Sequence, residues 1–513
     1  MSFLSVLPTT EAHPGPSVPP ARGPLLPAAL LGLLGILVSA LGSWQPSYWG
    51  DEAASVMSAE RSLPSLFRML GNVDAVHGTY YLILHFWIQA FGATEFSTRL
   101  PSAMAIGLAT AGTYLLARRL TGTTVAMISA LVFVLLPRVT YMGAEARSTA
   151  MATALSVWLV VLLVHIVCKP CTGRLARAGM WAGYAALLAT GIYMFLYVVL
   201  LIPVLAIAVF LLTPRDTRRT ATFRAWAVSS VAGLFLALPV MIASVQQREQ
   251  IAFIGRRPQI AVLDAAVRQW FGNTPLAVVA WGLVGVAIVT VYLLRGRRAA
   301  MPATKHALTI ALAWMLFPSA VLLVGTHVVT PMYSLRYLSI CTPAAAIAVG
   351  IGIAWLKPRW AQASVLVLIV SLMLPIYQAQ RGKYGKNSGS DWRQAADIVQ
   401  AGARPGDAIV FDESVRPSRK PRLALHLYPS AFQDMRDVTL ARAYDATGSL
   451  WDVTLPLASV GDRLTGTNTV WVLQYKGSKE FTSGNDIRTL QQLGFTVTGS
   501  TTVNRTIIIE LTR

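Results

Sequence analysis

The 513-residue sequence contains few charged residues for its length. Asp, Glu, Lys and Arg make up 13% of the chain and hydrophobic residues make up 54%, whereas a soluble protein carries about 25% charged residues. So few charges cannot cover the surface of soluble domains of this total size. The composition therefore excludes an ordinary soluble protein and predicts a polytopic α-helical membrane protein.

Cysteine is also scarce, and three residues of this type exclude a disulfide framework. Cys168 and Cys171 form one C-x-x-C pair, but the sequence has no second Cys pair to complete the four ligands of a zinc site. We interpret them as reduced thiols in a cytoplasmic loop, and Cys341 as a packing residue. The sequence also lacks a Gly-rich phosphate loop, so nucleotide binding is not indicated.

Acidic residues are fewer than basic ones. The chain has 43 Lys and Arg against 23 Asp and Glu, a formal net charge of +20. In a soluble protein such an excess indicates nucleic acid, but in a membrane protein it is expected in short cytoplasmic loops. The cations lie in short loops between alternate apolar runs. We therefore exclude nucleic acid as a partner.

Long apolar runs are abundant, and about 20 apolar residues suffice to cross a bilayer as a helix. We predict about eleven spans, with a disordered cytoplasmic tail before them at 1–24 and a signal peptide as the alternative for the first run. The predicted spans are 25–44, 98–117, 123–141, 147–167, 180–195, 196–212, 225–244, 274–294, 307–328, 335–356 and 360–378. Together they define a transmembrane domain over residues 25–378.

Residues 45–97 are predicted to form one long external loop. Residues 52–71 and the stretch YYLILHFWIQAFG are each expected to form a helix at the membrane surface. An odd number of spans with the amino terminus inside places the carboxy-terminal residues outside the cytoplasm. The predicted location is the plasma membrane, with the site and the carboxy-terminal domain on the extracytoplasmic side.

The carboxy-terminal residues 386–513 have a different pattern. The stretch DWRQAADIVQAGARPGDAIVF predicts an amphipathic helix, a Pro-Gly turn and a buried strand. TVWVLQY, DIRTLQQLGF and the final residues predict a strand, a helix and two closing strands. We therefore expect a small extracytoplasmic α/β domain.

Four groups of polar residues lie at the predicted external ends of the spans. Each has a plain structural interpretation: a helix N-cap at Asp51, interfacial tyrosines, a Glu–Arg pair within a turn, and a snorkelling Arg336. Charged groups at a bilayer interface are costly to desolvate, which favours a functional role. Since all four groups fall on one predicted side, we interpret them as one site. They comprise Asp51 and Glu52; Asp74, His77, Tyr80 and Tyr81; Glu145 and Arg147; and Tyr333 and Arg336.

The order of several short motifs resembles a known superfamily. A first span is followed by W-G-D-E, H-G-T-Y-Y, T-E-F-S-T-R-L-P-S-A and G-A-E-A-R-S. This order is similar to the polyprenyl-phosphate-dependent glycosyltransferases of the GT-C fold, in the branch of the protein O-mannosyltransferases and the aminoarabinose transferase. The Ala-, Arg- and Thr-rich composition and the predicted external α/β domain are similar to actinobacterial members. The resemblance is close over residues 25–150 and weaker in the R-Y-L segment. The later spans are similar only in their hydropathy. Many relatives have Pro-Pro-Leu-Tyr-Tyr where this chain has residues 77–81, His-Gly-Thr-Tyr-Tyr.

The resemblance implies transfer of a sugar, mannose or arabinose, from a polyprenyl-phosphate donor to a hydroxyl of an envelope glycan, lipid or protein, with inversion. It implies Asp51 as general base, Glu145 as the residue that orients the acceptor or Arg147, and Arg336 as the phosphate ligand. No cofactor is required and no metal ligand is predicted, although a divalent metal is compatible. The remaining donor-site residues are His77, Tyr81, Tyr333 and Arg147, while Glu52, Asp74 and Tyr80 contact the acceptor or support the site.

A secondary transporter or flippase of an envelope precursor is the alternative function. Transporters typically show an inverted repeat and ionisable groups near the membrane midplane. Here no internal repeat is evident in the sequence and the ionisable groups gather at one face. The enzyme is therefore favoured, with an oligosaccharyltransferase using a diphosphate donor left open.

Overall fold

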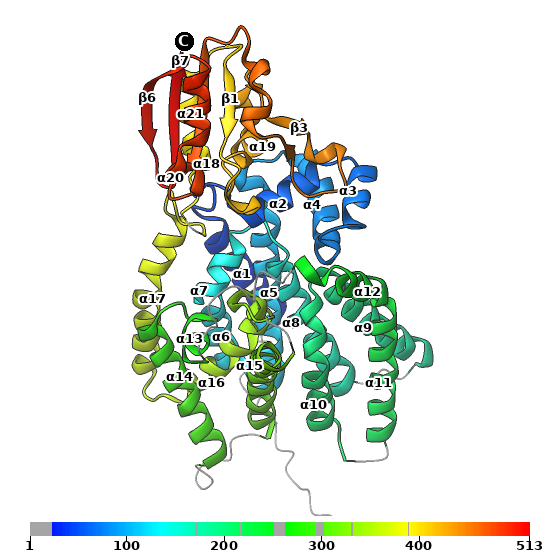
Figure 1. Cartoon of the computed structure of the whole chain (residues 1–513). Coiled ribbons are helices and arrows are strands. Elements are labelled where there is room, and N and C mark those ends of the chain that lie inside the picture. The colour runs from blue at the N-terminus through cyan, green and yellow to red at the C-terminus, as the bar shows by residue number, and fades with distance from the viewer. Residues whose placement is uncertain are drawn as a thin grey trace, which may run out of the picture.

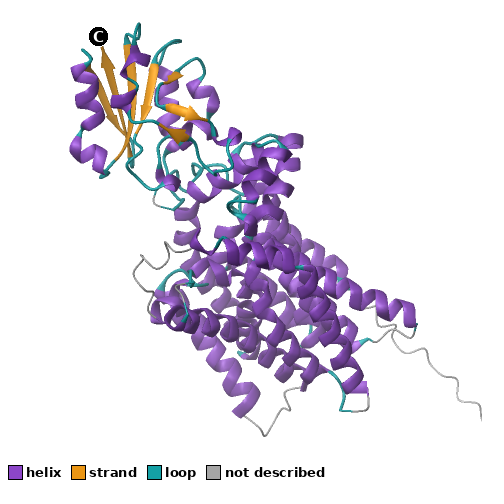
Figure 2. Ribbon diagram, turned by 45° about the vertical axis from the view of Figure 1, so that its right-hand side comes forward, coloured by secondary structure: helices purple, strands orange, loops and turns teal. Residues whose placement is uncertain are grey.

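The computed structural model describes residues 23–169, 173–215, 218–250, 262–293, 302–329, 332–387 and 389–513. The predicted tail, apart from its last two residues, and Cys171 lie outside the described residues. A helical bundle carries a smaller domain at one end (Figure 1), and the strands are confined to that smaller domain (Figure 2).

The bundle consists of helices that overlap every predicted span. Their sequences are apolar around the whole circumference, as expected where one side faces protein and the other faces lipid. At the contact of the first two long helices, a Cβ added to Gly107 would collide with Ile36, so glycine permits the close approach. The elements are α1 (Leu25–Ala40), α5 (Glu95–Leu120), α6 (Thr123–Leu135), α7 (Pro137–Gly143), α8 (Thr149–Cys168), α9 (Arg174–Met194), η2 (Leu196–Leu201), α10 (Ile202–Leu212), α11 (Arg218–Leu236), α12 (Leu238–Gln246), α13 (Val262–Arg268), α14 (Thr274–Ile288), η4 (Val289–Leu293), α15 (Pro302–Val328), η5 (Leu335–Cys341), α16 (Thr342–Trp355) and α17 (Arg359–Arg381).

The helices agree with the predicted membrane class. Within the described residues, six helices are long and apolar enough to cross a membrane, or up to eight if each bent pair counts as one span. The bent pairs are α6 with α7, at 62°, and α11 with α12, at 51°. Helix α1 and the η2–α10 pair are shorter apolar segments. The polytopic helical fold is therefore confirmed, while the number of crossings stays a prediction.

The segment between α1 and α5 folds into α2 (Gly50–Glu60), α3 (Leu63–Leu70), η1 (Ala75–His77) and α4 (Gly78–Phe91). The prediction of one helix over 52–71 is wrong. Arg61 and Ser62 have extended backbone, and Pro64 lies in the first turn of α3, where proline starts a helix more readily than it continues one. Helix α2 is buried along almost its whole length instead of lying on the membrane surface. The helix predicted in YYLILHFWIQAFG is present as α4.

The carboxy-terminal domain is a five-stranded mixed sheet in the order β2-β1-β5-β7-β6, with a separate β3-β4 pair. Strand β1 pairs in parallel with β2 and β5, while β7 pairs antiparallel with β5 and β6. Its elements are α18 (Trp392–Gly402), β1 (Ala408–Phe411), η6 (Pro417–Arg419), α19 (Leu423–Leu427), η7 (Pro429–Phe432), β2 (Arg436–Asp437), β3 (Leu440–Arg442), η8 (Tyr444–Ala446), β4 (Val453–Thr454), η9 (Leu457–Ser459), η10 (Gly461–Leu464), β5 (Thr469–Tyr475), α20 (Lys479–Ser483), α21 (Asn485–Gln492), β6 (Thr496–Thr502) and β7 (Thr506–Thr512). All the strands and helices expected here from periodicity are present.

This domain packs directly on the helices between α1 and α5. Met57 of α2 is fully buried in one apolar cluster with Trp392 and Leu427 of the domain. The Tyr428 hydroxyl accepts a hydrogen bond from the Tyr48 amide at 3.1 Å and donates one to a Glu95 carboxylate oxygen at 2.7 Å. These contacts hold α2, and with it the first predicted acidic residues, between the bundle and the domain.

Candidate active site

The first turn of α2 presents Asp51 and Glu52. The helix begins at Gly50 with Trp49 at the N-cap position, so the interpretation of Asp51 as the N-cap is wrong. A Cβ at Gly50 would collide with the Ser418 carbonyl oxygen of the carboxy-terminal domain. The domain therefore packs against the start of this helix and sets the position of both carboxylates.

Glu52 joins three parts of the chain in a buried ion pair. Its carboxylate accepts hydrogen bonds from Arg99 Nε at 2.7 Å and Arg99 Nη2 at 2.6 Å, and neither side chain is exposed. It also accepts the Ala146 amide at 2.9 Å, and Lys386 Nζ lies 3.9 Å away. Burial would raise the pKa of Glu52, but Arg99 and Lys386 outweigh it and lower the pKa. Since both oxygens are occupied, Glu52 positions α2 rather than reacting.

Asp51 forms an ion pair with Arg336 of η5, which lies 285 residues later in the sequence. The two side chains are 24% and 26% exposed, so this pair, unlike that of Glu52, is open to a ligand. Burial tends to raise the pKa of Asp51, but Arg336 and Arg147 overcome that effect and lower it. Asp51 is therefore ionised at neutral pH. The Arg336 guanidinium also lies 5.4 Å from the centre of the Trp49 ring.

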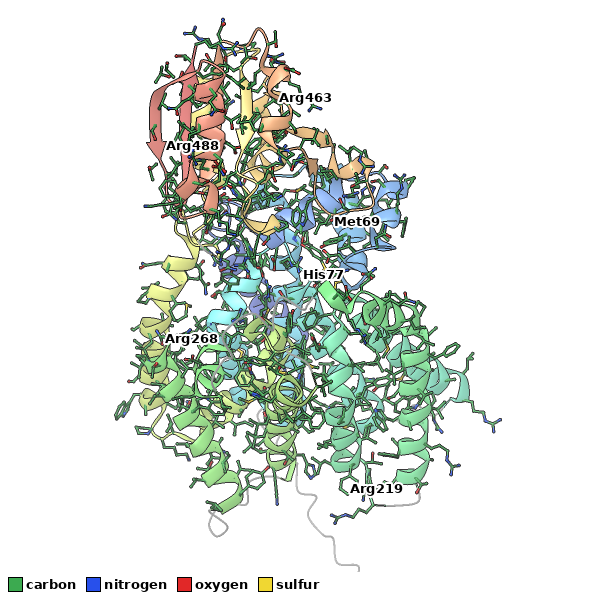
Figure 3. The ribbon with its side chains drawn as sticks, viewed as in Figure 1. Met69, His77, Arg219, Arg268, Arg463 and Arg488 are labelled. Atoms are coloured by element: carbon green, nitrogen blue, oxygen red, sulfur yellow. The ribbon has the colours of Figure 1, made fainter. Side chains whose placement is uncertain are left out.

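Arg147 connects Asp51 with the second predicted group. Its Nη1 donates to the Asp51 carbonyl oxygen at 3.2 Å and its Nη2 lies 3.1 Å from His77 Nε2. Because Arg can only donate, His77 Nε2 must accept, which places the histidine proton on Nδ1. Burial and then Arg147 lower the pKa of His77 well below its usual value, so the ring is neutral. Figure 3 shows His77 at the junction between the bundle and the helices that carry Met69 and the other residues between α1 and α5.

The neighbouring residues Asp74 and Tyr81 form a separate pair. The Tyr81 hydroxyl donates to Asp74 Oδ2 at 2.8 Å, and the Tyr81 ring centre lies 5.9 Å from that of His77. Burial is the main cause that raises the pKa of Asp74, and Tyr81 opposes it. Tyr80, on the same helix, is buried in the core. The structure thus brings Asp74, His77 and Tyr81 close to Arg147, while Tyr80 is buried in the core.

Glu145 lies in the loop between α7 and α8 and is 3% exposed. Its Oε1 atom has no hydrogen-bond partner among the described residues. Burial raises the pKa of Glu145, against the opposing effect of Lys386. The predicted Glu145–Arg147 ion pair is not formed within the part of the chain that the structure describes, since Arg147 turns toward Asp51 and His77. A buried carboxyl with an unused oxygen is suited to bind a hydroxyl of a ligand.

Tyr333 lies apart from the position we expected for it. Its hydroxyl donates to Gln269 Oε1 at 2.6 Å, and the side chain is buried. Tyr337, on the other side of Arg336, stacks on Tyr197 with ring centres 4.9 Å apart. These tyrosines pack the short helix η5 that carries Arg336.

Four residues that sequence reasoning missed complete the site: Trp49, Arg99, Arg138 and Lys386. Arg138 in α7 donates to the Gln269 carbonyl oxygen at 3.1 Å and lies within electrostatic reach of Glu145 and Arg336. Arg99 and Arg138 carried a usable signal, because charged residues inside apolar runs are rarely there without a partner or a function.

Lys386 is the least expected of the four. It follows α17 in a polar connection, a place where the sequence offers no signal for a buried cation. Its Nζ donates to the Ala144 carbonyl oxygen and lies 4.8 Å from the centre of the Tyr141 ring. Burial lowers the pKa of Lys386 to about 8. The ammonium group thus holds the start of the 144–147 loop through the Ala144 carbonyl.

The described residues contain no group of three or more His, Cys, Asp or Glu side chains placed to hold a metal ion. The charges of the site instead come from arginines, Lys386 and carboxylates. Such an arrangement can bind a phosphate through Arg336 and Arg138 and present an ionised carboxylate, Asp51, beside it.

Known proteins share the fold of this chain. Residues 79–242 match the family model described as dolichyl-phosphate-mannose-protein mannosyltransferase, and no curated protein sequence matches the chain. ArnT from Cupriavidus metallidurans, solved bound to undecaprenyl phosphate, is similar with a TM-score of 0.60 and 14% identity. That match covers 94% of this chain and 97% of ArnT.

Two further structures are more distant. The Archaeoglobus fulgidus oligosaccharyltransferase has a TM-score of 0.48 and 11% identity over 88% of this chain and 68% of its own. The arabinofuranosyltransferase AftD from Mycobacteria has a TM-score of 0.47 and 15% identity over 95% of this chain and 39% of its own. The family match and the ArnT likeness confirm the resemblance: the chain has the fold of the GT-C glycosyltransferases, and its residues 79–242 match the mannosyltransferase family.

Proposed function

We propose that this protein transfers a sugar from a polyprenyl-phosphate donor to a hydroxyl of an acceptor at the membrane surface. The single observation that carries the proposal is the partly exposed Asp51–Arg336 pair, held between the bundle and the carboxy-terminal domain. The family match over residues 79–242 supports a lipid-phosphate sugar donor. The fold shared with ArnT, a structure bound to undecaprenyl phosphate, supports the same class of donor.

In the proposed reaction Asp51 takes the proton of the acceptor hydroxyl as that oxygen attacks the anomeric carbon. The bond between this carbon and the phosphate oxygen breaks, and its electron pair leaves with the lipid phosphate. One displacement without a covalent intermediate inverts the anomeric configuration. A carboxylate suits this step because the hydroxyl becomes acidic only as the new bond forms.

We assign Arg336 two roles in this scheme: it pairs with Asp51 and it binds the donor phosphate. In the structure it pairs with Asp51. A guanidinium has five N–H donors, so a phosphate can share or replace Asp51 as its partner. The phosphate then draws positive charge away from Asp51, which brings the pKa of this carboxylate back toward its ordinary range and makes it a stronger base. Donor binding thereby prepares the base.

The other charged residues are assigned supporting roles. Arg138, within electrostatic reach of Arg336, adds to the charge that stabilises the departing phosphate. Arg147 and the neutral His77 bind donor or acceptor oxygens next to Asp51. Glu145 binds a sugar or acceptor hydroxyl through its unused oxygen. A departing monophosphate carries less charge than a diphosphate, so we propose that these cations suffice without a cofactor.

We propose mannose or arabinose as the sugar, an envelope glycan, lipid or protein as the acceptor, and the extracytoplasmic side of the plasma membrane as the place. The test is an assay of the purified full-length protein with a panel of polyprenyl-phosphate sugars and simple glycan, lipid and peptide acceptors. Transfer from one polyprenyl-phosphate sugar, with the opposite anomeric configuration in the product by NMR, is expected. Transport of the lipid across vesicles without any transfer would overturn the proposal in favour of the transporter.

A further inference from the structure

A cavity of about 400 Å³ lies at the end of the bundle away from the candidate site. It lies between the carboxy-terminal ends of α5 and α8 and the start of α1 at Pro24. Arg219, at the start of α11, marks the same end of the bundle in Figure 3, opposite His77. Helix α5 has 26 residues, a length of about 39 Å at 1.5 Å per residue. The head group of a ligand in this cavity would therefore lie far from Asp51.

The course of the two helices explains the position of the cavity. Helices α5 and α8 pack closely in their middle, where Trp158 Nε1 donates to the Leu108 carbonyl oxygen at 3.0 Å. A Cβ added to Gly112 would lie 2.9 Å from Val157, so glycine allows this contact. One to two turns further on, larger side chains line the space between the helices. The cavity thus begins where the close helix contact ends.

The cavity is lined by an apolar wall and by a cluster of basic side chains. Its wall consists of Leu115, Leu116, Val161 and Val164, and its basic residues are Arg118, Arg119, His165 and Lys169. Within the described ranges, no acidic side chain forms an ion pair with Arg118, Arg119 or Lys169. Arg118 is instead held by the Tyr114 hydroxyl, a neutral acceptor, at 3.1 Å. The cations therefore keep their charge available for an anion.

Cations at the ends of membrane spans also determine which way the spans are oriented, and they compensate the partial negative charge at the carboxy-terminal ends of helices. Those roles require no cavity and no apolar wall next to the charges. Together, a cationic rim, an apolar wall and an open volume match a ligand with an anionic head and a hydrocarbon tail, and basic pockets between membrane helices bind such heads.

We propose that this cavity binds an anionic phospholipid, with its phosphate against Arg118, Arg119 and Lys169 and an acyl chain along the α5–α8 wall. The bound lipid contacts the carboxy-terminal ends of α5 and α8, whose amino-terminal ends lie at the candidate site. Arg99 lies in the second turn of α5, and Arg147 comes just before α8. The lipid is thus expected to stabilise the helix pair without taking part in transfer.

The test compares lipid binding by two variants of the delipidated full-length protein. One variant carries Arg118→Gln, Arg119→Gln and Lys169→Gln. The control carries Arg224→Gln, Lys357→Gln and Arg359→Gln, which removes the same charge from exposed positions outside the cavity, in α11 and at the start of α17. Binding of phosphatidylglycerol in mixed micelles with phosphatidylcholine is measured by native mass spectrometry and by titration.

The cavity variant should lose affinity about fivefold for each cation, or about a hundredfold in total, whereas the control should bind like wild type. A phosphatidylglycerol-dependent rise in Tm should disappear in the cavity variant only. Equal binding by both variants, or displacement of the lipid by millimolar inorganic phosphate, would overturn the proposal. If the triple variant does not fold, the single variant Arg119→Gln is measured instead, and its affinity for phosphatidylglycerol should be about fivefold lower than that of wild type. Because binding is measured without donor, the result is independent of the proposed transfer.

Discussion

Replacing Asp51 with Asn removes one charge from the candidate site and leaves the side chain almost the same size. The Asp51–Arg336 pair is about a quarter exposed, and such pairs contribute about 0–1 kcal/mol to folding. The buried anchor of the same helix turn, Glu52 with Arg99, is untouched. We therefore expect normal expression, a Tm within a few degrees of wild type and an unchanged position of α2.

The effect on transfer should be far larger than the effect on stability. Loss of a general base commonly lowers a rate by about 10² to 10⁴, and Asn cannot accept the proton of the hydroxyl. The pKa of Asp51 lies below its ordinary value of 3.8, because Arg336 and Arg147 outweigh burial. Its stabilising ion pair is therefore fully present above pH 3.8 and is lost only as the pH falls through the lowered pKa. Over the neutral range, pH should change neither the charge of Asp51 nor this part of the stability.

The assay is single-turnover transfer from a saturating polyprenyl-phosphate sugar, with donor binding measured separately. The control is Asp264→Asn, which removes an exposed acid of α13 that pairs with Arg268 and should leave the rate unchanged. Donor should bind Asp51→Asn at least as well as wild type, because Arg336 loses its competing partner. A transfer rate within a few-fold of wild type would refute Asp51 as the base, and weaker donor binding would refute the competition between Asp51 and phosphate.

Other changes test the remaining assignments. Arg336→Lys should weaken donor binding and transfer about ten- to a hundredfold, since Lys cannot offer two parallel donors; wild-type binding would instead indicate a snorkelling residue. Glu52→Gln should lower the free energy of unfolding by about 3–5 kcal/mol because it leaves Arg99 buried without a counter-charge, and Glu52→Gln with Arg99→Met should be more stable than Glu52→Gln alone by thermal unfolding. Single cysteines at Ser500 and Ala303, in a background without native cysteines, should lie on opposite sides of the membrane, so that an impermeant thiol reagent labels only Ser500→Cys in intact cells. Labelling of both positions in intact cells would mean that the number of crossings differs by one from our prediction.

The membrane class and the order of the secondary structure could be predicted from the sequence because they depend on local properties. Burial of apolar side chains in lipid adds up along each run of residues, so every predicted span overlaps a helix in the structure. Alternation and turn residues similarly predicted the helices and strands after residue 386. The same local signals placed Asp51, Glu145 and Arg336 at span ends, where charges are costly without a partner or a function.

The partners of those residues were decided by tertiary structure. Asp51 meets Arg336 across 285 residues, and Lys386 reaches the Ala144 carbonyl across 242; such contacts depend on how whole helices pack, which no local pattern encodes. Local amphipathicity also misjudged the helix that carries Asp51, because the surface that appeared to face lipid is covered by the carboxy-terminal domain. Glu52, adjacent to Asp51 and chemically equivalent in the sequence, became a buried anchor only because Arg99 packs against it. The sequence thus determined which charges lie at this face, and packing decided which of them are used for structure and which remain open to a ligand.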